Sequence, residues 1–461
     1  MLFNNFSIIS IYFYFFRLIL AVQYNQINIK VNHEIMPEEF LQYVWENKLF
    51  FAENLKTSNG EKLEIVDVGK RNTNSGPDFF NAKIKIDETI WAGNIEIHKK
   101  SSDWLQHKHN TDKAYDNVIL HVVEIDDRQV TRVTGEKIAT LVFTYPEKLK
   151  TNYQNLLNSK TWIACQNQFH KINPVILQLG FNRLMIERLE NKTGEILERL
   201  IQNKNNWNET FYQILARSFG FKVNAIPFEM LAKAVSLKTL AKHKNSIFQL
   251  EALLFGSSGL LNEQLLGDGY FLKLREEYSF LFKKYGLQSI ESHLWKFMRL
   301  RPVNFPTIRI SQFAELIHRS DGLFSKILEI ENIGNLKGLF KVKASEYWNT
   351  HYSFNKQSSK DSVKELGENS IYTLIINVII PFLFVFGEKQ NKNYLQNRAL
   401  EFLEQLPPEK NSIISKWGKL GIQGRSAFET QALLQLKNLY CEKKKCLNCQ
   451  IGVKLVKNLA D

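Results

Sequence analysis

The sequence predicts an α+β protein in which a small mixed-sheet domain precedes a mostly α-helical domain. Alternating apolar residues and turn signals dominate up to about residue 150, and apolar residues recur with a period near 3.6 after it. A nearly unbroken apolar run at 118–125 is typical of a strand buried on both faces. The 461 residues, 44% of them hydrophobic, are enough to build the cores of two or three domains. We expect a hydrophobic leader at 1–35, the α/β domain at 36–150, the helical domain at 151–440 and a Cys-rich basic tail at 441–461.

The leader contains an apolar run, FSIISIYFYFFRLILAV at residues 6–22, which is interrupted by Arg17. This run is slightly short for a membrane-spanning helix and lacks the positive leader and small-residue cleavage site of a signal peptide. Met36 then opens an orderly amphipathic helix. We therefore expect the true start at Met36 and, with that start, no membrane association. The alternative is a membrane anchor within residues 7–22.

Charge and cysteine content suggest a compartment and a class of partner. Four cysteines in a chain of this length do not make a disulfide framework, which favours a reducing, cytoplasmic location. The formal net charge of +13 suits a polyanionic partner such as nucleic acid, because lysines and arginines neutralise phosphates. The charge is spread along the chain, so a Lys- and Asn-rich composition explains it equally well.

The α/β domain is expected to begin with a helix at 37–55, whose apolar stripe includes Phe40, Val44 and Trp45. A strand at 63–68 and a loop rich in turn formers, KRNTNSGPD, come next. A hairpin follows, and Asp87-Glu88 forms its turn. The remaining expected elements are the hairpin strands at 79–86 and 89–98, the buried strand at 118–125, and shorter strands near Val130 and at 138–143.

The helical domain is expected to contain roughly ten helices up to Tyr440 by its 3.6-residue period. Residues 352–369, with their Ser and Lys run, predict a loop. Residues 371–386 are apolar but short and include Pro381, which favours a buried core helix over a membrane span. The glycine pair Gly256–Gly259 lacks the Gly-Lys-Ser/Thr ending of a phosphate-binding loop and predicts a helix–helix turn.

The strongest chemical signal is Gly-Pro-Asp, ending at Asp78, followed by Glu96-Ile97-His98. Asp78 lies where the loop enters the first hairpin strand. Glu96 and His98 are two residues apart on the return strand and therefore share a face of the sheet. Carboxylates from two adjacent strands can hold a hard divalent cation such as Mg²⁺ or Mn²⁺, and a cation held in this way can activate water against a phosphodiester.

This arrangement resembles the PD-(D/E)XK nuclease superfamily, in which Pro-Asp opens one strand and Glu-x-Lys closes the next after a preceding helix. The resemblance covers about residues 37–125 and implies a restriction-endonuclease-like fold in which Asp78 and Glu96 ligate the metal. The lysine position of the superfamily falls on His98, which is a departure because neutral imidazole cannot supply a fixed positive charge. Lys100 shares the face of His98 and could substitute. The superfamily often carries a helix glutamate, for which Glu38, Glu39, Glu46 and Glu53 all qualify.

Each of these signals also has an ordinary structural explanation. Pro-Asp is a common turn opener, and an acidic residue two before a histidine occurs by chance. His107 and His109 lie in a lysine-containing segment, so a solvated loop is the default expectation, with phosphate or metal contact as the alternative. His121, within an apolar run, is expected to be a satisfied core histidine.

The cysteines form a second candidate site. Cys441, Cys446 and Cys449 make a C-x4-C-x2-C pattern, and Cys165 lies at the expected domain junction. Four thiolates are a complete ligand set for Zn²⁺ or an iron–sulfur cluster, and the lysines at 443–445 are expected to lower the thiol pKa values. The count is similar to that of recombination and CRISPR-associated exonucleases, although there the lone cysteine precedes the acidic motif. The alternative is unligated cysteines on a basic tail.

Several phrases resemble one specific family over the whole chain from about Met36. They are GPDFFNAKIKI, WAGNIEIHKKSSDW, AYDNVILHVV, EALLFGSSGLL, RPVNFPTIRI and CEKKKCLNCQIG. The chain is similar to the bacterial domain-of-unknown-function family 2851, a resemblance that implies no activity. The residues themselves favour a metal-dependent nuclease or a nuclease-derived DNA-binding protein. The alternatives are a non-catalytic interaction scaffold with a degenerate nuclease fold, and a membrane-anchored protein.

Overall fold

The computed structural model describes residues 36–262 and 267–458, and the expected leader at 1–35 lies outside them. The chain divides into two compact units. The first unit comprises the described residues up to Ile176 together with those from Tyr440 onward, and the second runs from Leu177 to Leu439. The sequence placed these boundaries at 150 and 440. The first unit extends further because α4 and the C-terminal segment both pack within it.

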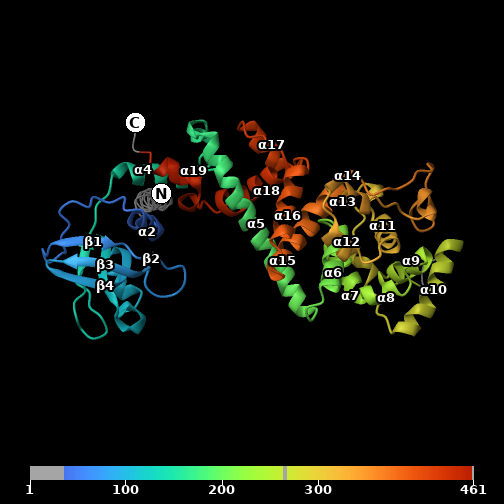
Figure 1. Ribbon diagram of the computed structural model, residues 1–461, viewed down its shortest axis with the longest axis horizontal. Helices are drawn as coiled ribbons and strands as arrows, with labels where there is room; N and C mark the ends of the chain where they lie inside the picture. The colour runs from blue at the N-terminus through green and yellow to red at the C-terminus, as the bar shows by residue number, and fades with distance from the viewer. Residues whose placement is uncertain (1–35, 263–266, 459–461) are drawn as a thin grey trace, which may run out of the picture. The chain divides into compact units, whose positions relative to one another are not determined.

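The first unit is built on a six-stranded mixed sheet (Figure 1). The strand order is β1-β3-β4-β5-β6, and the short β2 pairs with β3. β3 runs antiparallel to both β1 and β4, whereas β5 runs parallel to β4 and β6. The strands are β1 (Leu63–Asp67), β2 (Lys70–Arg71), β3 (Phe79–Ile86), β4 (Thr89–Lys100), β5 (Val118–Ile125) and β6 (Thr140–Val142). The sheet and the helices that follow it confirm the predicted α+β class.

The predicted hairpin is confirmed, and its tight turn contains Asp87 in the left-handed region at φ 49°. The expected strand near Val130 is reduced to one isolated bridge between Thr131 and Lys137. The helix expected at 37–55 is much shorter, α2 (Glu38–Glu46), because Asn47 and left-handed Lys48 end it. After the helix, the Phe51 amide donates a hydrogen bond to the Thr144 carbonyl at 2.9 Å.

A crossover of residues 101–117 carries the chain from the end of β4 to the beginning of β5. It contains α3 (Asp103–Gln106) and the 3-10 turns η1 (His109–Thr111) and η2 (Lys113–Tyr115). Trp104 and Tyr115 anchor it in a small core with Val118, Val130 and Ile138. Gly93 allows β4 to approach the start of β5, since a Cβ there would lie 2.6 Å from the Asn117 carbonyl oxygen.

The C-terminal segment returns to the first unit and lies beside α4 (Glu147–Asn158) (Figure 1). It contains η9 (Cys446–Asn448) and α19 (Gln450–Val456). The Asn152 side chain donates hydrogen bonds to the carbonyls of Val456 (3.2 Å) and Asn458 (2.9 Å). Phe40 of α2 stacks on Tyr153 of α4 at 5.4 Å, so two sequence-distant helices share one core.

The second unit is helical apart from one two-stranded ribbon, β7 (His351–Ser353) and β8 (Lys356–Gln357), which interrupts the loop expected at 352–369. The α-helices are α5 (Pro174–Gln202), which starts in the first unit, α6 (Trp207–Phe219), α7 (Ala225–Ala234), α8 (Leu237–Ala241), α9 (Ile247–Ser257), α10 (Gly269–Tyr285), α11 (Pro306–Arg319), α12 (Leu323–Glu329), α13 (Ile333–Leu339), α14 (Glu368–Leu374), α15 (Ile380–Lys389), α16 (Asn393–Gln405), α17 (Ser412–Lys419) and α18 (Ala427–Gln435). Short turns η3 (Gln166–Lys171), η4 (Ser292–Leu294), η5 (Pro302–Asn304), η6 (Glu346–Asn349) and the π-helix η8 (Leu436–Cys441) complete the secondary structure of the described residues.

The apolar segment around Pro381 forms one continuous helical stretch, Glu368–Lys389. A π-helical turn, η7 (Ile375–Ile379), immediately precedes the proline, which has no amide hydrogen to donate to the α-helical ladder. By length and composition this stretch could cross a membrane, but 72% of its most apolar window is buried inside the protein. A core helix of this kind meets the same criterion, so the stretch is weak evidence for a membrane span.

Packing of α19 within the first unit predicts a stability effect that sequence position alone would not suggest. Val456 is fully buried, whereas Lys454 on the same helix is exposed. Val456→Asp should destabilise the protein by about 3 kcal/mol or more, because it buries an unpaired carboxylate. Thermal unfolding followed by circular dichroism measures this loss. Lys454→Asp is the matched control, and equal melting temperatures for the two variants would show that α19 does not contribute to this core.

Candidate functional site

The register of the β3–β4 hairpin brings Asp78 and Glu96 together. Phe79 lies opposite Ile95, so Asp78, which immediately precedes β3, adjoins Glu96. The Asp78 amide donates to Glu96 Oε2 at 3.0 Å, and the Ile97 amide donates to Asp78 Oδ2 at 3.0 Å. Gln42 Nε2 of α2 donates to Asp78 Oδ1 at 2.7 Å. Both carboxylates are therefore held by directed hydrogen bonds before any ligand binds.

Burial dominates the electrostatics of this pair. Burial and the nearby charge of Glu96 raise the pKa of Asp78 to about 7. Burial, with a smaller contribution from the charge of Glu38, raises the pKa of Glu96 to about 8. Backbone hydrogen bonds to both carboxylates oppose these shifts without cancelling them. Carboxyls whose pKa values are raised toward neutral pH are typical of sites whose charge changes when a ligand binds or a reaction proceeds.

The structure selects one glutamate of α2 as a neighbour of the pair. The pKa of Glu38 is raised mainly by burial, and the charges of His107, Asp78 and Asp103 act on it at close range. Glu46 instead forms an ion pair with Arg71 at 3.5 Å, while Glu39 and Glu53 are exposed. The choice among four glutamates that the sequence left open is decided by the orientation of α2.

Histidine side chains surround the free oxygen of Glu96. His98 Nε2 and His109 Nε2 each lie 3.3 Å from Glu96 Oε1. His98 Nε2 is 3.1 Å from His107 Nδ1, and His98 Nδ1 is 2.8 Å from His121 Nε2. Burial, together with the neighbouring histidines, lowers the pKa of His98 to about 2. Because the Glu96 pKa is raised and the His98 pKa is lowered, their contact is one between neutral groups, not an ion pair.

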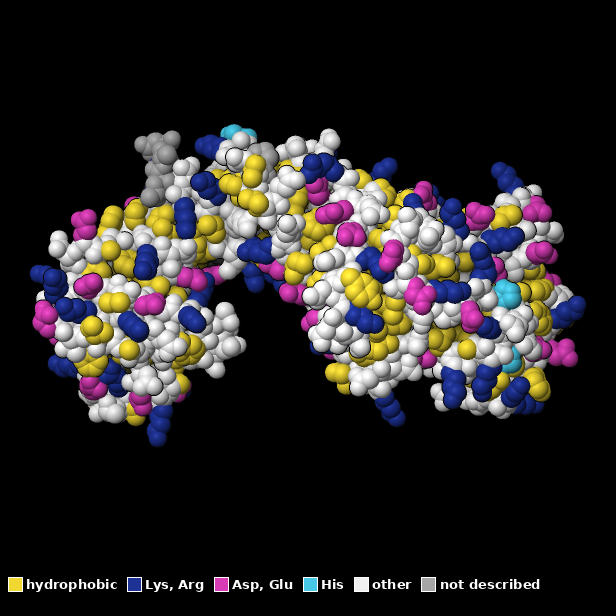
Figure 2. All heavy atoms as spheres, in the orientation of Figure 1, with side chains coloured by type: hydrophobic (Ala, Val, Ile, Leu, Met, Phe, Trp, Pro, Cys, Tyr) yellow, Lys and Arg dark blue, Asp and Glu magenta, His cyan; other side chains and the backbone are white. Residues whose placement is uncertain are grey.

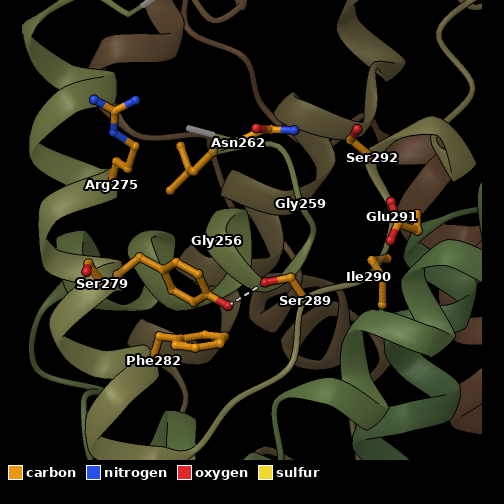
Figure 3. A pocket seen from close by; sticks show the side chains of 12 residues that line it. Gly256, Gly259, Asn262, Arg275, Ser279, Phe282, Ser289, Ile290, Glu291 and Ser292 are labelled. Atoms are coloured by element: carbon orange, nitrogen blue, oxygen red, sulfur yellow. Dashed lines mark hydrogen bonds between the residues drawn. The ribbon is translucent and has the colours of Figure 1, made fainter. Parts of the chain in front are cut away.

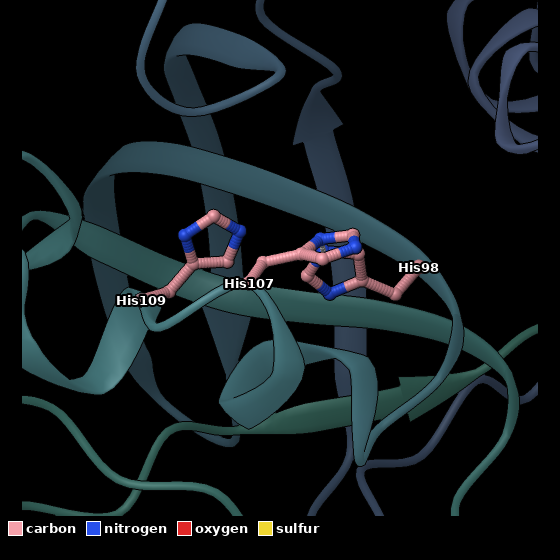
Figure 4. Close-up of side chains that lie close together, drawn as sticks. All are labelled: His98, His107 and His109. Atoms are coloured by element: carbon pink, nitrogen blue, oxygen red, sulfur yellow. Dashed lines mark hydrogen bonds between the residues drawn. The ribbon is translucent and has the colours of Figure 1, made fainter.

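The crossover places His107 and His109 over β4 (Figure 4). His107 ends α3, His109 opens η1, and Lys108 between them is left-handed at φ 63°, which turns both rings toward His98. Tyr115 stacks on His109 with ring centroids 3.7 Å apart, and Trp104 meets His109 edge-on. His109 is buried and His107 is exposed. The default expectation of a solvated loop is therefore wrong for His109, and the H-x-H spacing was the signal for it.

His98, His107 and His109 form a group whose ligating atoms all lie within 4.8 Å of one another. His121 is buried in the core as expected, but it is not fully satisfied, because Nε2 contacts His98 while Nδ1 has no hydrogen-bond partner. Lys100 lies apart from this cluster. Its side chain is exposed, and its backbone amide bonds the Asp103 carboxylate at 3.0 Å.

The four cysteines all belong to the first unit and are present as thiols. Cys446 and Cys449 are buried, while Cys165 and Cys441 are half-buried. Burial and the nearness of Cys449 and Cys446 raise the pKa of Cys165 to about 12, and burial raises that of Cys446 to about 11. The expectation that Lys443–Lys445 lower these pKa values is wrong for these two thiols, because burial outweighs the charge of Lys444. Within the described residues the sulfurs form no group as tight as that of the histidines.

A hollow of about 460 Å³ in the helical unit lies between α9 and α10 (Figure 3). The Tyr278 hydroxyl bonds Ser289 Oγ across its floor at 2.8 Å, and Arg275 and Glu291 lie on its rim. Gly256 lines this hollow at the end of α9, where a Cβ would collide with the Tyr278 ring at 2.0 Å. Gly256 is therefore explained by the packing of α10 on α9, and Gly259 by its left-handed backbone at φ 74° and its approach to the Ile290 carbonyl, in agreement with a turn after α9.

The raised pKa of Glu96 predicts how stability depends on pH. The ordinary pKa of glutamate is 4.5, and that of Glu96 in the folded protein is about 8. Between these two pH values the folded state binds more protons than the unfolded state, so the free energy of unfolding falls as pH rises through this window. Glu96→Gln removes this loss, since its carbonyl still accepts from Asp78. In the presence of a chelator, chemical denaturation should find the variant gaining on the parent from pH 5 to pH 8.5, by on the order of 1 kcal/mol or more. A constant difference across this range would mean that Glu96 is already ionised.

Comparisons with known proteins place the chain in a family. No curated protein and no solved structure matches it. A family described as "Protein of unknown function (DUF2851)" matches residues 38–412, which include the whole Asp78–Glu96–histidine site and most of the helical unit. Because this match covers most of the sequence, the chain belongs to the DUF2851 family.

Proposed function

We propose that this protein is a metal-dependent phosphodiester hydrolase, that is, a nuclease, with its site at Asp78 and Glu96. The observation that carries the proposal is the pair of carboxyls from adjacent strands, buried Glu96 and half-buried Asp78, which are linked by the 3.0 Å bond between the Asp78 amide and Glu96. Glu38 adds a third carboxylate from the preceding helix. The order of elements resembles that of the PD-(D/E)XK superfamily. A helix precedes a strand opened by Pro-Asp, and the return strand carries Glu-x-His where the superfamily has Glu-x-Lys.

The residues have distinct parts in such a reaction. A bound Mg²⁺ or Mn²⁺ would lower the pKa of its water and polarise the phosphodiester. Asp78 and Glu96 supply the negative charge that attracts the cation, and their raised pKa values mean that binding releases protons. His98, kept neutral by burial, can accept a hydrogen bond from the attacking water. Lys100, being exposed and apart from the cluster, has no part in this proposal.

The proposed partner is nucleic acid, and the proposed compartment is the cytoplasm. The net charge of +13 favours a polyanion. Figure 2 shows lysines and arginines mixed with acidic side chains on the visible face of each unit, not gathered in one patch. A dispersed charge of this kind supports contacts to the phosphate backbone more than reading of bases. The four thiols are consistent with a reducing environment.

One observation favours a second candidate, a non-catalytic scaffold with a degenerate nuclease fold. The position of the superfamily lysine is occupied by His98, and Lys100, which shares its face of β4, is exposed to solvent. A scaffold of this kind would bind nucleic acid or protein without cleaving a phosphodiester.

Cleavage of labelled single-stranded and duplex DNA and RNA, with Mg²⁺ or Mn²⁺ and with EDTA, tests the proposal. Asp78→Asn and Glu96→Gln should each reduce the rate about 100-fold or more, because they remove charge that binds the cation. Glu88→Gln, in the exposed turn of the same hairpin, is the matched control and should cleave like the parent.

Equal activity in Asp78→Asn and the parent would refute this mechanism. Binding without cleavage of any substrate by the parent, under all these metals, would favour the scaffold.

A further inference from the structure

We infer that the site binds a transition-metal ion of the zinc class through Glu96 Oε1 and the ring nitrogens of His98, His107 and His109. This inference deepens the proposed function by naming its cation, which the carboxylates alone would assign to Mg²⁺ or Mn²⁺. Metal binding can be measured without any cleavage, so the two proposals can fail separately.

Three distances among the four atoms match those of a tetrahedral ion. Zinc–nitrogen and zinc–oxygen bonds of roughly 2.0–2.1 Å place neighbouring ligands of a tetrahedron roughly 3.3 Å apart. Glu96 Oε1 lies 3.3 Å from the Nε2 atoms of both His98 and His109. His98 Nε2 and His107 Nδ1 are 3.1 Å apart. The ligating atoms of the three histidines all lie within 4.8 Å of one another, so only a small closing movement brings them around one ion with Glu96 Oε1.

The remaining atoms of these side chains are engaged in ways that leave the ligating atoms available. Glu96 Oε2 accepts from the Asp78 amide, which leaves Oε1 facing the histidines. His98 Nδ1 is bonded to His121 Nε2, an outer-shell contact that fixes the ring and presents Nε2 to the ion. His109 Nε2 is buried and makes no hydrogen bond, because its 3.3 Å approach to Glu96 lacks the required geometry.

A buried nitrogen without a partner is costly unless something binds it. Here the ring of His109 cannot simply turn to solvent, since Tyr115 stacks on it at 3.7 Å and Trp104 packs against its edge. Three imidazoles with one carboxylate oxygen suit zinc, and by the same donor chemistry Co²⁺, Fe²⁺ or Mn²⁺, better than the all-oxygen preference of Mg²⁺.

The inference changes the parts assigned to His98 and Asp78. Both ring nitrogens of His98 are then occupied, Nδ1 by His121 and Nε2 by the ion, so His98 holds the metal and does not accept a hydrogen bond from the attacking water.

The Oδ1 and Oδ2 atoms of Asp78 accept from Gln42 and from the Ile97 amide, so Asp78 is a positioning residue for Glu96 and β4. Exposed His107 forms the solvent side of the site, where a water ligand or substrate oxygen would enter.

Elemental analysis of the full chain, stripped by chelator and reloaded with Zn²⁺, tests the site. His107→Ala and His109→Ala should each weaken zinc binding by more than the roughly 10–100-fold that loss of an outer-shell partner costs. His170→Ala, an exposed histidine in the same unit, is the matched control and should bind like the parent. Exposed His107 keeps the test valid if His109→Ala does not fold.

Cobalt substitution separates this site from the cysteines, because thiolate ligands give charge-transfer absorption that nitrogen and oxygen ligands do not. The inference requires a Co²⁺ d–d spectrum that survives Cys446→Ser and is lost in His107→Ala. Unchanged zinc affinity in both histidine variants would overturn it. Tight zinc binding by a protein that cleaves no nucleic acid would retain this site and reject the nuclease.

Discussion

The parallel pairing of β4 with β5 is the constraint on which the rest of the first unit depends. Two parallel strands cannot be joined by a tight turn, so residues 101–117 must cross one face of the sheet to reach the start of β5. Glu96 lies beside His121 in this register. The crossover, anchored by buried Trp104, then lies over the face that carries Glu96 and His98. The path of this connection therefore brings six titratable groups together: Asp78, Glu96, His98, His107, His109 and His121.

The cost of burying these groups is considerable, which argues against a purely structural origin. Two carboxyls and three histidines are driven toward their neutral forms by desolvation, and two imidazole nitrogens, His109 Nε2 and His121 Nδ1, lack a hydrogen-bond partner. Apolar side chains of the same volume would pack here without that cost. A cluster that is rich in ligand atoms, and whose burial costs free energy unless a ligand binds, has the physical character of a preorganised binding site.

The C-terminal segment adds a second long-range constraint. Its return to α4 means that the first unit is complete only when residues 440–458 have been made. All four thiols then belong to one unit, although some 276 positions separate Cys165 from Cys441. The raised pKa values of Cys165 and Cys446 reflect burial, and the histidine cluster, not the cysteines, holds the closest-packed ligand atoms among the described residues.

The sequence by itself determined the α+β class, the hairpin predicted at 79–98 and the buried strand at 118–125, because periodicity and turn chemistry act over a few residues. It also identified Asp78, Glu96 and His98, since residues two apart on a strand share a face. Only the tertiary structure decided the rest. It selected Glu38, left Lys100 exposed, and added His107 and His109 through the left-handed Lys108. These choices depend on helix orientation and on the path of a crossover, which are set by packing between distant segments and not by local pattern.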